Sequence, residues 1–228
     1  MRNPTLRSYC HPALVLGAAL CLAGALLAQP ASAQRRATMK QHQIADGVYM
    51  MENSEGSGNS TFVITDEGVV LFDADVRTAD QVLAAIRKLT DKNVRYLITS
   101  HAAGDHATGA WHLREDRPVY IATRRQMRDM FMQETKEFDE RKAASKPEEG
   151  GYAVAELVRP DIGFEGSLTL QFGGLTFQLT EEGHGHSTSD VTLYIPQKRV
   201  FLMGDLLNND IHPGQSESGG VHYANVNG

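Results

Sequence analysis

Cysteine is nearly absent from this chain, and its position limits the chemistry of the mature protein. The sequence has 228 residues and two cysteines, Cys10 and Cys21, which both precede a predicted cleavage point after Ala33. A chain cut there has no cysteine, so it forms no disulfide even in an oxidising compartment. It also lacks a thiolate ligand, which leaves histidine and carboxylate side chains for any metal site.

A membrane-spanning length of apolar residues is also missing. The apolar run from Ala13 to Ala28 is shorter than the roughly 20 residues that cross a bilayer as a helix. Two arginines precede this run, and Ala31-Ser32-Ala33 follows it with the small residues that signal peptidase recognises. We therefore expect residues 1–33 to be a secretory signal peptide, and the mature protein to be periplasmic or secreted. The alternative is an uncleaved membrane anchor.

An excess of basic residues is lacking as well. The chain has 22 Lys and Arg against 28 Asp and Glu, which gives a formal net charge of −6 at pH 7. A mildly acidic chain without a basic stripe argues against nucleic acid as a partner. We expect a small-molecule substrate and no membrane association after cleavage. The oligomeric state stays open.

What the mature chain does contain is a series of β-branched and apolar runs of strand length. Turn signals at residues 46–47 and 66–68 divide the first runs into hairpins, and glycine and proline separate the later ones. Predicted strands cover residues 44–51, 61–65, 69–73, 94–100, 119–122, 168–172, 175–180, 191–195 and 200–203.

Two helices are predicted between these strands. Residues 78–90 carry apolar side chains at helical spacing, and Thr78 with Gln81 has the pattern of a capping box. Residues 123–144 are predicted to be mostly helical, and residues 146–151 to be a polar loop. The apolar side of the second helix is predicted to consist of Met127, Met130, Phe131 and Phe138. Strands, helix, strand, helix and strands again indicate a layered α/β fold with mixed sheets.

Residues 100–106, Ser-His-Ala-Ala-Gly-Asp-His, are the most informative stretch. They place two imidazoles and a carboxylate directly after an apolar strand. A loop at the end of a strand lets such side chains converge on a metal without unpairing the sheet. Imidazole nitrogen and carboxylate oxygen are the ligands that zinc accepts when cysteine is absent.

Two later loops carry residues of the same types. His186 follows the strand predicted at 175–180, and Asp205 ends the strand predicted at 200–203. An isolated histidine or aspartate in a loop is usually a solvated side chain or a cap. Three such loops, each following a strand, are instead typical of a metal site built along one edge of a sheet.

These segments resemble the metallo-β-lactamase-fold hydrolases over nearly all of residues 44–210. The family's first motif, His-x-His-x-Asp-His, corresponds to residues 101–106, and its Gly-His-Ser/Thr motif corresponds to residues 185–187. Its strand ending in Gly-Asp corresponds to residues 204–205. Two earlier segments, residues 59–64 and 71–73, are also similar, and all five segments occur in the family's order.

The resemblance implies an αββα sandwich of two mixed β-sheets with helices on the outer faces. It also implies a metal centre that holds one or two Zn²⁺ ions. Position by position, His101 and His186 would bind the first zinc, Asp105 and His106 the second, and Asp205 would bridge the two. Asp105 would in addition orient the nucleophile.

The chain departs from the family pattern at two places. Ala103 stands where the family has its middle histidine, so the first zinc loses one ligand. The family's last ligand lies on a loop well beyond the Gly-Asp, and the sequence ends at Gly228. We therefore expect residues 34–228 to be a metallo-β-lactamase-like domain that is incomplete at its C-terminus.

The other histidines are expected to have ordinary roles. His184 lies two residues before His186, where the family places no ligand, and a metal role is the less favoured alternative for it. His42, His112 and His222 match none of the motifs. His212, which precedes a proline, is only weakly similar to a substrate-side loop residue of some relatives.

The resemblance implies a zinc-dependent hydrolase in which a metal-bound hydroxide attacks an ester-, thioester-, lactone- or β-lactam-type carbonyl. The alternative is a degenerate member that keeps the fold and residual metal binding but catalyses weakly or not at all. The absent cysteine excludes the β-lactamase subtypes that use a thiolate ligand.

Overall fold

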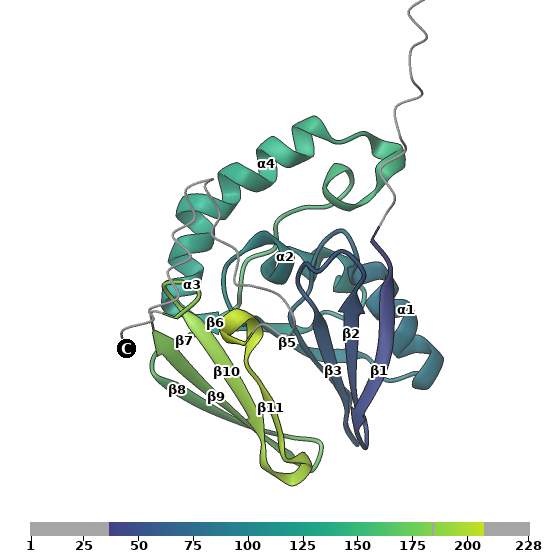
Figure 1. Ribbon diagram of the computed structural model, residues 1–228, viewed down its shortest axis with the longest axis vertical. Coiled ribbons are helices and arrows are strands. Elements are labelled where there is room, and N and C mark those ends of the chain that lie inside the picture. Colours follow the sequence, from purple (N-terminus) through teal and green to yellow (C-terminus); the bar gives the residue numbers. More distant parts are fainter. Residues whose placement is uncertain (1–36, 184, 208–228) are drawn as a thin grey trace, which may run out of the picture. The chain divides into compact units, whose positions relative to one another are not determined.

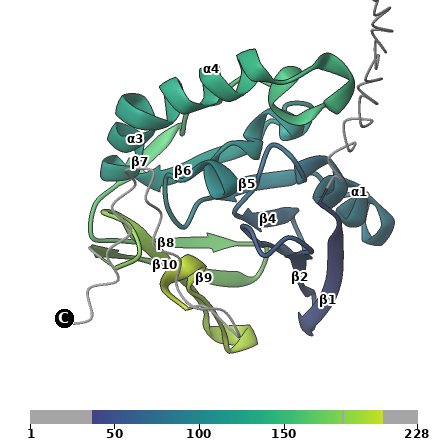
Figure 2. The same ribbon diagram turned by 45° about the horizontal axis from the view of Figure 1, so that its top comes forward.

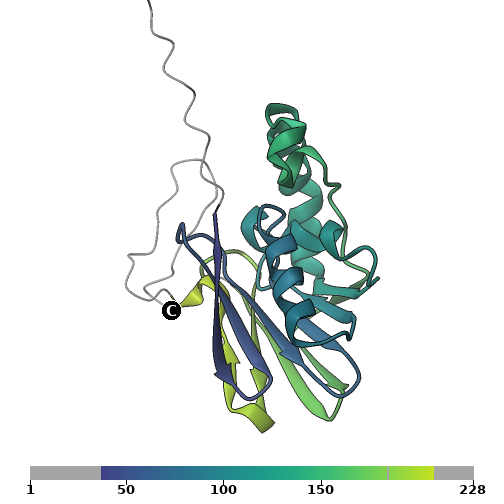
Figure 3. The ribbon, with the colours of Figure 1, turned by 90° about the vertical axis from the view of Figure 1, so that its right-hand side faces the viewer.

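A computed structural model describes residues 37–207 except residue 184, and these residues form two β-sheets packed face to face (Figure 1). The larger sheet has seven strands in the order β1-β2-β3-β4-β5-β6-β7, and the smaller has four in the order β11-β10-β9-β8. Helices α3 and α4 lie on the side of the larger sheet that faces away from the smaller one (Figures 2 and 3). The predicted α/β sandwich is confirmed. Within the described residues, no α-helix covers the outer face of the smaller sheet.

The larger sheet is mixed because its connections change in length along the chain. Hairpin turns join β1 to β2 and β3 to β4, and β1 to β4 are antiparallel. Longer crossovers that contain helices join β4 to β7, and these strands are parallel. The strands are β1 (Met39–Ala45), β2 (Val48–Asn53), β3 (Ser60–Ile64), β4 (Val69–Phe72), β5 (Val94–Ile98), β6 (Val119–Thr123) and β7 (Ile162–Phe164).

The smaller sheet differs from the expected second mixed sheet, because each of its strands turns back on the one before it. Its strands are β8 (Ser167–Phe172), β9 (Leu175–Gly183), β10 (Asp190–Ile195) and β11 (Val200–Leu202). All three pairs are antiparallel. The turn between β8 and β9 contains Gly173 with φ 53°. A Cβ at Gly173 would collide with the side chain of Thr65, so this turn packs tightly against the β3–β4 turn of the larger sheet.

Four α-helices are present among the described residues, and none of them is long and apolar enough to cross a membrane. They are α1 (Ala79–Leu89), α2 (Gly104–Ala107), α3 (Arg124–Asp129) and α4 (Thr135–Ala144). A π-helical turn, Met130–Glu134, links α3 to α4. The wider turn shifts the helical register, and Phe131 within it is 59% exposed whereas Phe138 after it is buried. The prediction that Phe131 belongs to the apolar side is therefore wrong.

The start of α1 also differs from its prediction. Thr78 precedes the helix, but its side chain makes no capping hydrogen bond. The side chain of Gln81 instead donates to the backbone oxygen of Ala37 at 2.9 Å and accepts from the backbone N–H of Met39 at 3.1 Å. Because the amide is engaged in this way, it joins α1 to the first strand rather than closing a capping box.

Several short features were not predicted from the sequence. Strand β7 has three residues, one of them a glycine, which is too short for an alternating pattern. The predicted polar loop at 146–151 contains the 3₁₀ turn Pro147–Glu149, and a second 3₁₀ turn begins at Gly151.

An apolar core joins the two sheets and fixes their relative position. Side chains from both inner faces contribute to it, and most are fully buried. Its buried members are Val48, Val63, Val70, Phe72, Ile98, Ile121, Phe164, Phe177, Leu179, Val191, Leu193 and Ile195. A second cluster packs α1 against the other face of the larger sheet. Loops at the edge shared by the two sheets are consequently held by both.

Candidate metal centre

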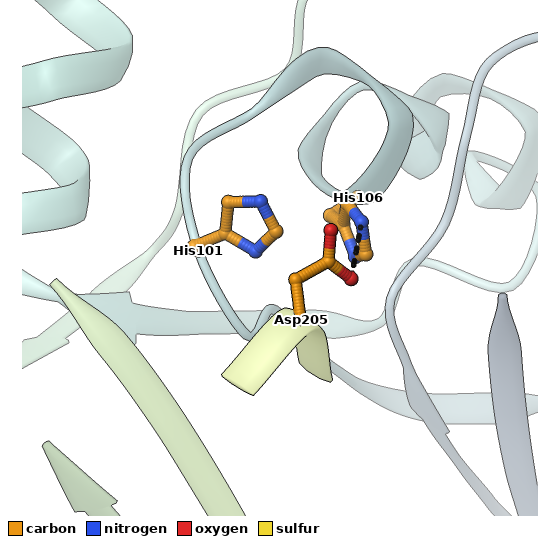
Figure 4. Close-up of side chains that lie close together, drawn as sticks. All are labelled: His101, His106 and Asp205. Carbon is orange, nitrogen blue, oxygen red and sulfur yellow. Dashed lines mark ion pairs between the residues drawn. The ribbon is translucent and has the colours of Figure 1, made fainter. Parts of the chain in front are cut away.

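Two imidazoles and one carboxylate converge at this shared edge (Figure 4). His101 follows β5, His106 lies in α2, and Asp205 lies in a 3₁₀ turn directly after β11. One ligand atom from each of the three lies within 4.8 Å of the others. His106 Nε2 is 3.4 Å from Asp205 Oδ1. This spacing is suited to three ligands around a single ion.

The hydrogen bonds of the two imidazoles leave one nitrogen of each available. His101 and His106 are 1% and 2% exposed. His101 Nδ1 lies 3.0 Å from the hydroxyl oxygen of Ser100, and His106 Nδ1 lies 2.9 Å from Asp73 Oδ2. Both Nε2 atoms are buried and neither makes a hydrogen bond in the described part of the chain, although His106 Nε2 faces carboxylate oxygens of Asp205 at 3.4 Å and Asp105 at 3.7 Å. A buried imidazole nitrogen is rarely left in this state unless a metal or substrate engages it, so the residues fit a metal ion.

Asp73 organises this arrangement from behind the imidazoles. Its carboxylate accepts from the backbone N–H of Ser100 at 2.6 Å and from the Ser100 hydroxyl at 2.8 Å. Burial raises the pKa of Asp73, although His106 and the two bonds from Ser100 act in the opposite direction. When His106 is neutral, contact of this carboxylate with Nδ1 favours the tautomer in which Nε2 carries the lone pair.

The two imidazoles differ in their protonation. Burial and the neighbouring His106 hold the pKa of His101 well below its usual range, so His101 is neutral and able to bind a metal. Burial alone would also lower the pKa of His106, but Asp73, Asp205 and Asp105 outweigh it and raise that pKa well above the usual range. A metal ion at His106 would therefore compete with a proton.

His186 lies beside the same position. Its ring packs edge-on against that of His101 with centroids 4.8 Å apart, and its Nε2 is 3.6 Å from Asp205 Oδ2. The loop that carries it is held by Asp190, whose carboxylate accepts from the backbone N–H groups of Gly185 at 3.1 Å and Ser187 at 2.8 Å. These bonds fix the backbone on both sides of His186.

Asp105 is close to the centre but is engaged by other groups. Its Oδ2 accepts from the Ser57 hydroxyl at 2.8 Å and from the Gly58 N–H at 3.0 Å, and lies 3.7 Å from His106 Nε2. Burial would raise the pKa of Asp105, but His106 and these hydrogen bonds lower it below the usual range. A Cβ at position 58 would collide with the backbone oxygen of Asp105, so Gly58 permits this close approach.

Glycine is also required where Asp205 enters the site. Gly204 has φ 53°, and a Cβ there would lie 2.5 Å from the Cβ of Ser100. The end of β11 therefore packs directly against the end of β5. Burial would raise the pKa of Asp205, but the histidines of the site lower it to about 2.

The structure thus brings together the five ligand residues predicted from the sequence, with Asp105 turned toward Ser57 and Gly58. Ala103 directly precedes α2, and its backbone oxygen accepts from the N–H groups of His106 and Ala107. The positioning roles of Asp73 and Asp190 were not predicted. Asp73 belongs to one of the resembling segments, but no sequence pattern showed that it contacts a histidine 33 positions away.

The histidines outside the centre that the structure describes have ordinary surroundings, as predicted. His42 pairs with Glu52 at 2.7 Å on the surface, and His112 Nε2 lies 2.9 Å from the backbone oxygen of Val76. His184, His212 and His222 lie outside the described residues, as do the predicted signal peptide and cleavage point.

Comparisons with known proteins agree with this fold. The family model of the metallo-beta-lactamase superfamily matches residues 53–224. The DIM-1 metallo-beta-lactamase is similar in structure, with a TM-score of 0.60 and 17% identity over 81% of this chain and 78% of that one. The Pontibacter korlensis metallo-beta-lactamase has a TM-score of 0.56 and 17% identity over 70% of this chain and 68% of its own.

A protein that is named for a different activity is also similar in structure. A variant of the sec-alkyl sulfatase PisA1 has a TM-score of 0.54 and 17% identity over 70% of this chain and 30% of its own. At these identities the likeness shows the fold alone. No curated protein sequence matches the chain.

Proposed function

Because the chain belongs to the metallo-beta-lactamase superfamily over residues 53–224, we propose that it is a zinc-dependent hydrolase. Its substrate in this proposal carries an ester-, thioester-, lactone- or β-lactam-type carbonyl. The observation that carries the proposal is the convergence of three buried or partly buried ligand groups: His101 Nε2, which has no hydrogen-bond partner in the described residues, His106 Nε2 and the Asp205 carboxylate that it faces at 3.4 Å.

In this proposal His101, His106 and Asp205 hold the ion, and His186 is a further candidate ligand beside them. Zinc, when bound, lowers the pKa of a water molecule and polarises a carbonyl oxygen. We expect one tightly held ion rather than two, because Ala103 supplies no side-chain ligand and a four-coordinate zinc needs three protein ligands besides water.

The remaining groups orient reactants and protons. Asp73 holds the proton of His106 at Nδ1, which directs the Nε2 lone pair toward the ion. Ser57 and Gly58 fix the carboxylate of Asp105, whose lowered pKa keeps it ionised at neutral pH. We assign Asp105 the role of orienting the attacking water as a hydrogen-bond acceptor.

A second candidate function rests on Ala103. Its methyl group leaves the metal with fewer ligands than the family pattern provides, and losses even outside the ligand set typically cost 10–100-fold in affinity or activity. In this alternative the chain keeps the fold and binds zinc weakly, without efficient turnover.

The test combines metal analysis with hydrolysis assays. We expect about one zinc per chain after gel filtration, and chelator-sensitive turnover of at least one substrate among a chromogenic β-lactam, a nitrophenyl ester, a thioester and a lactone. His106→Ala should lose both zinc and turnover. Zinc binding without turnover on all four substrates would favour the degenerate alternative.

A matched histidine serves as the control. His42 is partly exposed and paired with Glu52 on β2, so His42→Ala should retain zinc and turnover. Full zinc content in His106→Ala, or hydrolysis that survives removal of all metal, would contradict the proposed function.

We also propose that the protein is exported. The supporting observations are the two arginines, the apolar run and the Ala-Ser-Ala sequence at residues 31–33. Expression in a bacterial host should give a periplasmic or secreted protein whose intact mass corresponds to a chain that begins at Gln34. A mass that retains residues 1–33 would refute cleavage.

A further inference from the structure

Gln126 is a fully buried amide next to the candidate metal centre, and no motif marks it. It lies in the first turn of α3, where its backbone N–H donates to the Thr123 hydroxyl at 3.1 Å and its Oε1 accepts from the Thr123 N–H at 3.0 Å. These two bonds form a capping box at the start of the helix. A cap on α3 uses only the oxygen of the amide.

The nitrogen of the same amide reaches both sheets. Gln126 Nε2 donates to the backbone oxygen of Ser100 at 2.8 Å and to that of Ser189 at 2.9 Å. Ser100 immediately precedes His101, and Ser189 lies three residues after His186 at the start of β10. One side chain therefore connects the two loops that carry these histidines.

Further contacts reinforce the same connection. The N–H of Val191 donates to the Ser100 oxygen at 2.7 Å, which joins β10 directly to the end of β5. On the exposed side of α3, the Thr188 hydroxyl donates to Asp129 Oδ2 at 2.6 Å. Arg125 Nη1 also donates to the Thr188 oxygen at 3.3 Å. The first two turns of α3 thus contact the His186 loop through three side chains.

We propose that Gln126 is a positioning residue that sets the separation of His101 and His186. Their rings lie edge-on with centroids 4.8 Å apart, and each loop is tied to the same amide nitrogen within four residues of its histidine. The inference rests on the proposed function, because the two imidazoles matter as a pair only around a common ion.

The alternative is that the amide merely satisfies buried carbonyls and has no effect on the ligands. Gln81 provides a matched control, since its amide also bridges two backbone groups, but these lie at residues 37 and 39, between α1 and β1. Methionine has nearly the shape of glutamine without its hydrogen bonds. Gln81→Met removes two such bonds away from the centre, whereas Gln126→Met removes those to Thr123, Ser100 and Ser189 and a longer one to the Thr99 oxygen at 3.2 Å.

The experiment measures zinc affinity by chelator competition and ligand geometry by the visible absorption of the cobalt-substituted protein. We expect both variants to lower the thermal midpoint of the metal-free protein. Gln126→Met should weaken zinc binding roughly 10- to 100-fold and change the cobalt spectrum. Gln81→Met should leave affinity within about twofold and the spectrum unchanged.

Gln126→Glu keeps the test decisive if Gln126→Met does not fold. It retains the oxygen that accepts from the Thr123 N–H, and hence the capping box, but removes the amide donor to Ser100 and Ser189, so it should weaken zinc binding by about tenfold. Wild-type affinity and spectrum in either Gln126→Met or Gln126→Glu would overturn the positioning role. A wild-type protein that binds neither zinc nor cobalt would instead overturn the proposed function, and the inference with it.

Discussion

Asp73 shows how much of the site depends on one side chain outside the ligand set. Its φ of 63° is unusual for a residue with a Cβ. This conformation turns the carboxylate back toward Ser100 and His106. There it accepts a hydrogen bond from the backbone N–H of Ser100, the residue before His101, and contacts Nδ1 of His106. Aspartate tolerates the left-handed region better than most residues, and the contacts it makes there offset the strain.

Ala103→His should strengthen metal binding. The family pattern has a histidine at this position, so the substitution supplies a further imidazole from the loop that already carries His101. We expect zinc affinity to rise by roughly tenfold or more, with a gain of hydrolysis on simple esters or a chromogenic β-lactam. Chelator competition and initial rates measure the two effects.

Two other alanines separate this effect from the mere addition of a histidine. Ala102 packs against the cluster under α1, so Ala102→His should destabilise the fold without tightening zinc. Ala143 is exposed in α4, and Ala143→His should change neither stability nor affinity. Equal zinc affinities for the Ala103 and Ala102 variants would show that the loop geometry has been assigned wrongly.

Glu134 should make the stability of the protein depend on pH. Burial and the nearby Glu137 raise its pKa from 4.5 to about 7, although Arg141 acts in the opposite direction. The folded state therefore keeps this proton to higher pH than the unfolded state does, and stability falls as pH rises from 4.5 to 7. Glu134→Gln removes the ionisation, so above pH 7 the variant should be more stable by roughly 1–3 kcal/mol.

Denaturant unfolding at pH 5 and pH 8 measures this difference. The gain from Glu134→Gln should be larger at pH 8. Glu140, which is exposed on α4, provides the control, since Glu140→Gln should change the free energy of unfolding by the same amount at both pH values. An equal effect of Glu134→Gln at both pH values would show that the carboxyl does not titrate in this range.

The π-helical turn between α3 and α4 decides which phenylalanine of this helix supports the fold. Phe138 is 2% exposed and packs against Tyr152, whereas Phe131 is 59% exposed beside Arg159. We expect Phe138→Ala to lower the free energy of unfolding by about 3–5 kcal/mol. Phe131→Ala should lower it by less than about 1 kcal/mol. Chemical denaturation of both variants tests this ranking. Similar losses in the free energy of unfolding would contradict the conclusion that Phe138, and not Phe131, lies on the buried side of the helix.

The longer elements could be predicted from the sequence because each carries its own pattern. The β-branched runs at residues 61–65 and 69–73 gave β3 and β4, and the helical spacing at 78–90 gave α1. Strand β7 and the π-helical turn could not be predicted, because neither has a periodicity of its own. Both depend on tertiary packing.

The candidate site could be predicted only as far as its ligands follow strands. The order of the loops placed His101, His106 and Asp205 together. The amide of Gln126 and the carboxylate of Asp73 contact groups that are far away in the chain, and no spacing rule connects such partners. Their roles therefore required the structure.

At the scale of the whole molecule, the centre is a product of the contact between the two sheets. His101 and His106 belong to the larger sheet, whereas His186 and Asp205 enter from loops of the smaller one. Neither sheet supplies a complete set of ligands. Metal affinity should consequently report on the docking of the sheets, and changes in the apolar core between them should weaken zinc binding even far from the edge.

The position of Gly204 against Ser100 has a consequence for the order of events in folding. The close approach exists only after β11 has met β5, strands that are far apart in the sequence. Contacts between distant segments form late, so zinc should bind after the rate-limiting step. Saturating zinc should then slow unfolding by about the whole of its stabilisation and leave the refolding rate nearly unchanged. Stopped-flow folding with and without zinc measures both rates, and faster refolding in zinc would place the ligands in the folding nucleus.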